Sequence, residues 1–429
     1  MILRCTLSFV LVVLTTVVLT TLSASGENPD RNWTQWRGNH RNSQVSGDWP
    51  DELNDSTLKE VWRKPFGPSY SGPIVYGDNV FITETRDKKD EVVYALSKET
   101  GNEKWQVRWP GSMSVPFFAM KNGSWIRSTP ATDGKRLFIA GMLGRFVCVD
   151  IESGKEVWAV DFSERYGVKR EDFGQVCSPL IIDNSDNFIY IQCSAGFIKM
   201  ERSTGKEIWR TLYDGGSMMS RGAFSSPYVA TVAGKKQILV QTRTHLTGVD
   251  MDSGQTLWQQ AVPSFRGMNI LTPTAYGDTV FTSSYRQKSF GFNISKSGDG
   301  FSVEEKWDAP SKAYMSSPVI VGDNLYMHLQ NRRIASLSLK DGKTNWISSK
   351  SFGEYWSMVT NGNRILALDS SGKLILMNAN PEKFEVVGQV KLKTNDSWAH
   401  LAVVGNRIYV RGLKSMAVYE WSNSQDSTP

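Results

Sequence analysis

Short apolar runs separated by glycine-containing turns recur along almost the whole chain. Residues 74–76 and 80–82 are apolar and flank Gly77-Asp78, and residues 319–321 and 325–327 flank Gly322-Asp323 in the same way. Apolar runs of this length, bounded by turn residues, predict β-strands. Each pair therefore predicts a strand, a tight turn and a second strand. Further first strands begin at a Ser-Pro or Thr-Pro step, at residues 129–130, 178–179, 226–227 and 272–273.

A third apolar run leads into a polar turn and a fourth strand that carries a tryptophan. Residues 150–158 and 250–258 read Asp-x-x-Ser-Gly-x-x-x-Trp, and residues 97–105 and 201–209 are close variants that keep the glycine and the tryptophan. The polar side chains of such a turn bond local backbone, and glycine supplies a positive φ. Each unit therefore predicts four antiparallel strands, with the tryptophan covering one sheet against the next.

The units repeat at intervals of roughly 40 to 55 residues, which is typical of stacked supersecondary units. Weaker copies end at Trp307, Trp346 and Trp421, and the copy ending at Trp307 has an enlarged turn at residues 293–300. The last copy has no room for a fourth strand, whereas residues 59–63 resemble a fourth strand without the other three. We predict an all-β fold, an eight-bladed β-propeller of four-stranded antiparallel blades, closed by an N-terminal strand pairing with the last blade. Seven blades with one irregular insertion is the alternative.

The two ends of the chain differ from the repeats. Residues 1–25 place Arg4 before a long apolar stretch and small residues at 23–25, the order of a secretory signal peptide, although the stretch is also long enough for an uncleaved anchor. We expect residues 26–58 to be an N-terminal lead-in, residues 59–421 a single propeller domain and residues 422–429 a flexible tail. The protein is then exported, to the periplasm or cell envelope.

Charge and cysteine content narrow the function. The formal net charge is +6, and about +5 once Arg4 is removed, with no basic run that would mark a nucleic-acid groove. We therefore expect no nucleic-acid partner, membrane contact only through an uncleaved signal segment, and a monomer. Cys148, Cys177 and Cys193 remain after export. Cys177 and Cys193 are equidistant from the centre of a predicted hairpin turn, so either a disulfide or two buried thiols fits them.

The repeated turn and tryptophan resemble the docking motif of the quinoprotein-type β-propellers, also called pyrroloquinoline-quinone-like repeats. The resemblance covers about residues 33–421, and Trp33 to Asn39 is similar to the lead-in of exported bacterial members. It implies one of two functions. Some members are alcohol or sugar dehydrogenases that hold pyrroloquinoline quinone and calcium in the central funnel, and others are non-enzymatic scaffolds, including the propeller lipoprotein of the outer-membrane barrel-assembly machinery.

The chain lacks adjacent cysteines and a Cys-x-x-Cys-His haem site. We therefore expect a non-catalytic binding or scaffold protein for a protein or cell-envelope ligand, with no cofactor. A quinone-dependent dehydrogenase with pyrroloquinoline quinone and calcium is the alternative, and Asp172, Glu354 and Asp396 are the carboxylates nearest the funnel for a cation.

Residues just before each first strand enter the central channel from one face, so their side chains converge from different blades. The candidates for ligand binding by this argument are Trp125, Arg127, Arg221, Tyr314, Trp356, Trp398 and His400. Aromatic rings and arginines can stack a planar ligand and bind a carboxylate or glycan. Aromatic residues that merely plug the channel are the other interpretation. An insertion at residues 109–120 carries methionine and phenylalanine, and it either offers a partner surface or folds back over the channel.

Overall fold

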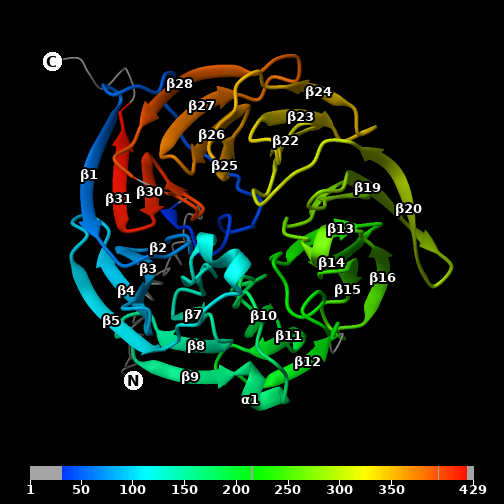
Figure 1. Cartoon of the computed structure of the whole chain (residues 1–429), viewed down its shortest axis with the longest axis horizontal. Helices are drawn as coiled ribbons and strands as arrows, with labels where there is room; N and C mark the ends of the chain where they lie inside the picture. The colour runs from blue at the N-terminus through cyan, green and yellow to red at the C-terminus, as the bar shows by residue number, and fades with distance from the viewer. Residues whose placement is uncertain (1–30, 214–215, 395, 423–429) are drawn as a thin grey trace, which may run out of the picture.

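Eight antiparallel sheets surround a central axis in the computed structural model, which describes residues 31–213, 216–394 and 396–422. The expected signal peptide and the tail from residue 423 lie outside these ranges. Figure 1 shows the ring of sheets, with β1 (Leu58–Pro65), in blue, lying outside β31 (Ser415–Trp421), in red. Glu60 of β1 pairs with Tyr419 of β31. The predicted eight blades and the closure by an N-terminal strand are confirmed.

The first four blades follow one another along the chain. Blade 1 consists of β2 (Ile74–Tyr76), β3 (Asn79–Arg86), β4 (Asp90–Ser97) and β5 (Glu103–Pro110). Blade 2 consists of β6 (Ala131–Thr132), β7 (Arg136–Ala140), β8 (Arg145–Asp150) and β9 (Glu156–Asp161). Blade 3 consists of β10 (Phe188–Cys193), β11 (Gly196–Glu201) and β12 (Glu207–Thr211). Blade 4 consists of β13 (Tyr228–Val232), β14 (Lys235–Gln241), β15 (His245–Val249) and β16 (Thr256–Ala261).

The other four blades complete the ring. Blade 5 consists of β17 (Thr274–Tyr276), β18 (Thr279–Ser283), β19 (Ser289–Ser297) and β20 (Gly300–Ala309). Blade 6 consists of β21 (Val319–Val321), β22 (Asn324–His328), β23 (Ile334–Ser338) and β24 (Thr344–Ile347). Blade 7 consists of β25 (Trp356–Asn361), β26 (Arg364–Asp369), β27 (Lys373–Asn378) and β28 (Glu385–Lys391). Blade 8 consists of β29 (Ala402–Val404), β30 (Arg407–Gly412), β31 and β1.

Helical structure is confined to connections. The short helices are η2 (Phe117–Asn122), α1 (Phe162–Tyr166) and η3 (Phe265–Gly267). Within the described ranges, no helix has the length and apolar character needed to cross a membrane.

Two blades depart from the predicted pattern. The first strand of blade 3 is reduced to one bridge, Leu180 with Tyr190, because both backbone groups of Ile181 bond the Gln35 side chain, at 3.0 and 2.9 Å, instead of a neighbouring strand. In blade 5 the enlarged turn expected at residues 293–300 is a long hairpin, in which Ser297 pairs with Gly300.

The repeated tryptophans hold neighbouring blades together. A Cβ atom added to Gly154 of blade 2 would lie 2.7 Å from the Trp105 ring of blade 1, so the indole lies directly on the glycine. The Trp105 Nε1 donates to Ile151 O at 3.0 Å, in the same turn. Trp158 repeats this arrangement on Gly205 of blade 3. The structural role predicted for these tryptophans follows from this contact.

A belt of hydroxyl groups links the blades around the channel. Thr129 N–H donates to Ser178 Oγ at 2.9 Å, and Ser178 N–H donates in turn to Ser226 Oγ at 3.0 Å. Thr272 N–H and Ser317 Oγ repeat the bond at 3.2 Å. The Ser-Pro and Thr-Pro steps therefore do more than start a strand, because the hydroxyl satisfies a backbone donor of the preceding blade.

The lead-in fills the axis of the ring on one side. Arg41 is buried and donates to Ser178 O at 3.0 Å, to Pro227 O at 2.9 Å and to Pro179 O. Arg37, also buried, donates to Pro318 O. Ser43 is joined to Thr360 of blade 7 by a backbone hydrogen bond of 2.7 Å. The segment expected to precede the propeller is thus part of its core.

Candidate functional site

The channel contains a cavity of about 130 Å³ next to the lead-in. We call this cavity the chamber. Its aromatic walls are formed by Trp36, Tyr70, Phe224, Tyr355 and Trp398. Trp36 belongs to the lead-in, and its Nε1 donates to Thr272 Oγ1 at 3.2 Å. The Trp398 ring lies between Tyr70 and Tyr355, with centroid distances of 5.7 Å to each. Four of the five rings come from segments that precede a first strand, as the channel argument predicts, whereas Trp36 comes from the lead-in.

One charged side chain enters the chamber. Arg127 lies with its guanidinium carbon 5.6 Å from the centroid of the Tyr70 ring, and its Nη2 donates to Gly123 O at 2.7 Å. Its Nε is buried and has no hydrogen-bond partner among the described residues. Burial lowers the pKa of Arg127 from its usual value, although the group stays cationic at neutral pH.

A second cavity, of about 300 Å³, opens beside the chamber and shares Arg127 with it; we call it the mouth groove. Its lining is rich in methionine and phenylalanine, including Phe118, Phe173, Met218, Met219, Met268 and Met315. The charged residues of the lining are Arg127, Arg243 and Arg266. The mouth groove is therefore an apolar, cationic surface that continues into the channel.

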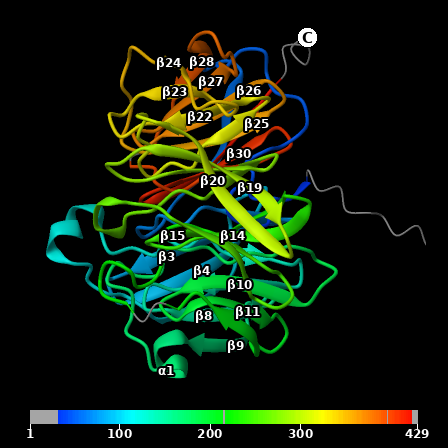
Figure 2. The ribbon, with the colours of Figure 1, turned by 90° about the vertical axis from the view of Figure 1, so that its right-hand side faces the viewer.

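The insertion at residues 109–120 forms one wall of this groove. Figure 2 shows the cyan segment that contains η2 standing out from one face of the ring. Phe118 packs edge-on against Phe173, with centroids 6.0 Å apart, and Arg266 lies over the Phe118 ring at 5.9 Å. Phe117 nevertheless remains 84% exposed and Met120 63% exposed. The insertion thus folds back over the channel mouth and still presents apolar side chains to solvent.

The candidate residues do not all meet at the channel. Arg127 and Trp398 line the chamber, and Trp125 lies close to the Tyr70 side chain. Arg221 forms an ion pair of 2.6 Å with Asp172. The ring of Tyr314 packs against Tyr285 at 5.2 Å, behind the groove.

Two candidates are structural and are placed wrongly by the channel argument. Trp356 is fully buried between blades and stacks on His328 with centroids 5.9 Å apart, because its own strand turns the indole into the core. His400 lies beneath the lead-in, against Trp33 at 5.9 Å and Ser43 at 3.3 Å. Burial, followed by the nearby Arg37 charge, lowers the pKa of His400 to about 3, so it is neutral.

The carboxylates near the channel do not converge. Asp172 is engaged by Arg221, and Glu354 is 3.5 Å from Arg332. In the described part of the chain, no group of three or more His, Cys, Asp or Glu side chains could hold a metal ion. Asp396, the third carboxylate of the quinone hypothesis, is likewise outside any such group.

The three described cysteines are free thiols and all are buried. The Leu180–Tyr190 bridge has the register that the hairpin argument assumed, but the first strand does not continue, and the Cys177 Sγ instead donates to Ser178 O at 3.6 Å. The disulfide considered for Cys177 and Cys193 is therefore not formed in this structure.

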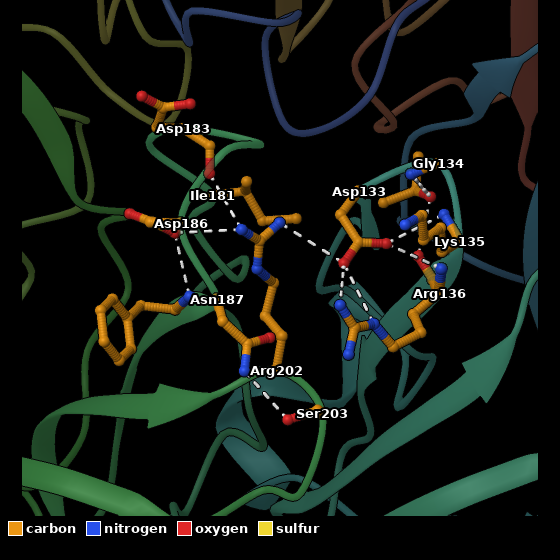
Figure 3. Close-up of polar contacts among 12 residues, drawn as sticks. Asp133, Gly134, Lys135, Arg136, Ile181, Asp183, Asp186, Asn187, Arg202 and Ser203 are labelled. Carbon is orange, nitrogen blue, oxygen red and sulfur yellow. Dashed lines mark hydrogen bonds and ion pairs between the residues drawn. The ribbon is translucent and has the colours of Figure 1, made fainter.

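A second polar cluster lies at the turns on the opposite side of blades 2 and 3 (Figure 3). The buried Arg202 guanidinium lies 3.4 Å from Asp133 and 3.0 Å from Asp186, and it donates to Asp183 O at 3.0 Å. Figure 3 shows Arg202 between the two carboxylates. The Arg202 guanidinium forms ion pairs with carboxylates on both sides, so this cluster links blades 2 and 3.

Sequence reasoning missed Trp36 and the methionines of the mouth groove. Met218, Met268 and Met315 all lie shortly before a first strand, which is the criterion that selected the aromatic candidates. The same criterion, applied to every large apolar side chain, identifies these methionines as well. Trp36 had no such signal, because the repeats do not show that the lead-in enters the channel.

Comparison with known proteins agrees with this architecture. A sequence model of the family described as outer membrane protein assembly factor BamB matches residues 52–124 and 89–348. The chain belongs to this family. It is 21% identical over 361 residues to the BamB of Moranella endobia, covering 80% of this chain and 85% of that protein, and 20% identical over 389 residues to the BamB of Yersinia pestis, covering 87% and 91%.

Solved structures share the fold of this BamB-family chain at low identity. The crystal structure of BamB from Moraxella catarrhalis gives a TM-score of 0.60 with 14% identity, covering 85% of this chain and 98% of that one. The quinohemoprotein alcohol dehydrogenase ADHIIG from Pseudomonas putida HK5 gives 0.54 with 10% identity, covering 91% and 80%. These similarities show a shared propeller fold. The function has to be inferred from the residues of the channel, because one fold serves many functions.

Proposed function

We propose that this chain is an exported, non-catalytic propeller that binds a protein or another component of the cell envelope. The observation that carries the proposal is the mouth groove, an accessible apolar surface with arginines in its lining. Exposed apolar side chains such as Phe117 and Met120 cost solvation unless a partner covers them, and clusters of them mark interaction sites.

Family membership supports the same function. Relatives that align with most of this chain are named outer membrane protein assembly factors. We extend this role to the chain as a scaffold for a protein partner in the periplasm or cell envelope, where it acts as a monomer.

The quinone-dependent dehydrogenase is the alternative, and the residues present do not fit its cofactor. A calcium ion takes six to eight oxygen ligands in proteins, whereas no carboxylate is found among the described residues that line the chamber. The chamber, at about 130 Å³, is also smaller than the roughly 300–1,000 Å³ of most pockets for small ligands. Calorimetric titration of residues 26–429 with pyrroloquinoline quinone, with and without calcium, should give no binding heat. Tight, calcium-dependent binding would favour the dehydrogenase.

Photo-crosslinking in the native host tests the binding function directly. A photoreactive amino acid at position 117 should crosslink to an envelope protein, identified by mass spectrometry. The matched control carries the same group at Val157, which is 49% exposed but lies on the outer strand β9. Equal yields at both positions, or none at position 117, would contradict a partner at the channel mouth.

A further inference from the structure

Three arginines of the channel mouth have no carboxylate partner among the described residues. Arg127 lies where the chamber and the mouth groove meet. Arg266 and Arg286 lie at the rim, with guanidinium carbons 5.1 and 4.5 Å from the centroid of the Phe265 ring. The other charged side chain of the groove, Arg243, holds the wall by donating to the carbonyl groups of Gly267 and Arg266, at 2.6 and 2.9 Å. The site is therefore cationic at its base and at its edge.

The surface between these arginines is apolar and adaptable. Four methionines and four phenylalanines line it, and Phe118 and Met219 are 51% and 43% exposed. Methionine has three rotatable bonds and a polarizable sulfur, so it conforms to side chains of different shape. A surface of this kind suits one or two large apolar side chains of a ligand better than a single rigid molecule.

We propose that the mouth groove and the chamber together bind an extended segment of a partner protein that combines acidic and large apolar residues, with a ligand carboxylate at Arg127 and apolar side chains on the methionines. This inference rests on the proposed binding function and specifies the partner's chemistry. Arg266 and Arg286 then face further acidic residues of the segment at the rim.

The geometry of Arg127 favours a carboxylate over other groups. Its Nε is buried without a partner, and a buried donor that lacks a hydrogen bond costs about 1–3 kcal/mol. The bond to Gly123 O and the contact with the Tyr70 ring fix the orientation of the guanidinium. A carboxylate would satisfy the donor and neutralise the charge, and paired N–H groups of arginine match its two oxygens. A basic segment is repelled, because the described residues of the groove lining include three arginines and no acidic residue.

Selection from a random decapeptide library displayed on phage tests this chemistry, with residues 26–429 as the immobilised protein. We expect enriched sequences that place Asp or Glu next to Phe, Leu or Met. The enriched peptides are then synthesised and titrated against variants. Arg127→Gln should weaken their binding by about tenfold or more, because a charge-assisted hydrogen bond is lost. No enrichment over a blank surface, or enrichment of basic sequences, would overturn the proposal.

Two further variants separate binding from folding. The double variant R266Q and R286Q changes exposed side chains, so it should fold normally, bind the peptides several-fold less tightly, and show a weaker dependence on salt. The control Arg108→Gln, on the exposed outer strand β5, should bind like the wild type. Equal peptide affinity for wild type, R127Q and the double variant would overturn the site. If peptide selection fails while position 117 crosslinks to an envelope protein, this inference is wrong and the proposed function stands.

Discussion

At the scale of single residues, five of the contacts between blades depend on a turn glycine that accepts an indole face. Gly154 has a φ of +69°, and any Cβ there would lie 2.7 Å from the Trp105 ring. Gly277 has a similar φ of +54° but has open space around a Cβ. The pair therefore separates backbone strain from loss of packing between blades.

We expect Gly154→Ala to lower the free energy of unfolding by about 2–4 kcal/mol, since both strain and the displaced indole contribute. Gly277→Ala should cost only about 1–2 kcal/mol, the cost of the left-handed conformation alone. Urea unfolding followed by tryptophan fluorescence measures both values. Equal losses would show that the tryptophan docking adds no stability.

The buried Arg202 clamp allows a second residue-scale test. The side chains of Arg202 and Asp133 are 1% and 3% exposed, whereas those of the Arg145–Glu156 pair are 36% and 44% exposed. Arg202→Met removes one of the two arginine partners of Asp133, which Arg136 still pairs at 2.8 Å, and the partner of the half-buried Asp186, so we expect a loss of about 1–3 kcal/mol. Arg145→Met should cost less than about 1 kcal/mol. Thermal unfolding of both variants checks the prediction, and equal effects of Arg202→Met and Arg145→Met would mean that Arg136 alone is a sufficient partner for Asp133.

At the scale of elements, the lead-in lies at the centre of the ring and forms hydrogen bonds with several blades. It satisfies backbone groups of blades 3 and 4 through Arg41, of blade 6 through Arg37 and of blade 7 through Ser43. Even with blade 8 completed by β1, the carbonyl groups around the channel would lack donors if the lead-in were absent.

We expect Arg41→Met to lower the free energy of unfolding by about 2–3 kcal/mol, because the carbonyl groups of Ser178, Pro179 and Pro227 lose their donor. It should also expose the lead-in to limited proteolysis. The exposed Arg31, in the same segment, is the matched control, and Arg31→Met should change neither measurement. Unchanged stability of Arg41→Met would show that water replaces the guanidinium.

At the scale of the whole molecule, stability depends on buried acidic groups, among them Glu91 and Glu171. Burial raises the pKa of Glu91 to about 7, and that of Glu171 to about 8, above the ordinary value of about 4.3. Groups with a raised pKa stabilise the fold fully below their unfolded value, and this contribution is lost as the pH rises through the folded value. The free energy of unfolding that they contribute therefore falls between about pH 4.5 and pH 8.

We expect the double variant E91Q and E171Q to gain stability relative to the wild type as the pH rises from 5 to 8.5, by several kcal/mol at roughly 1.4 kcal/mol per unit of pKa shift. Burial lowers the pKa values of His328 and His400 to about 4 and about 3, so these residues reduce the free energy of unfolding as the pH falls. The wild type and the variant are therefore compared at each pH. Urea unfolding at the two pH values provides the measurement. A constant difference would mean that both carboxylates are ionised in the fold.

Much of the fold was contained in the repeats. The Gly and Trp of each turn are local features, and their spacing determined the blade number, the Trp docking and the donor of the missing strand in blade 8. The same reasoning was weaker for the site. It placed Arg127 and Trp398 in the channel, but it misplaced Trp356 and His400, because one residue of offset along an extended segment turns a side chain from the channel into the core.

By itself, the sequence determined a closed ring of four-stranded blades and favoured eight of them over seven, since each unit carries its own strand pattern and cannot bury its apolar face alone. Only the tertiary structure decided that the lead-in fills the axis, that Gln35 replaces a strand partner in blade 3, and that methionines from several blades meet Arg127 at one groove. These contacts join residues far apart in the chain, and periodicity within a unit carries no information about which distant side chains converge.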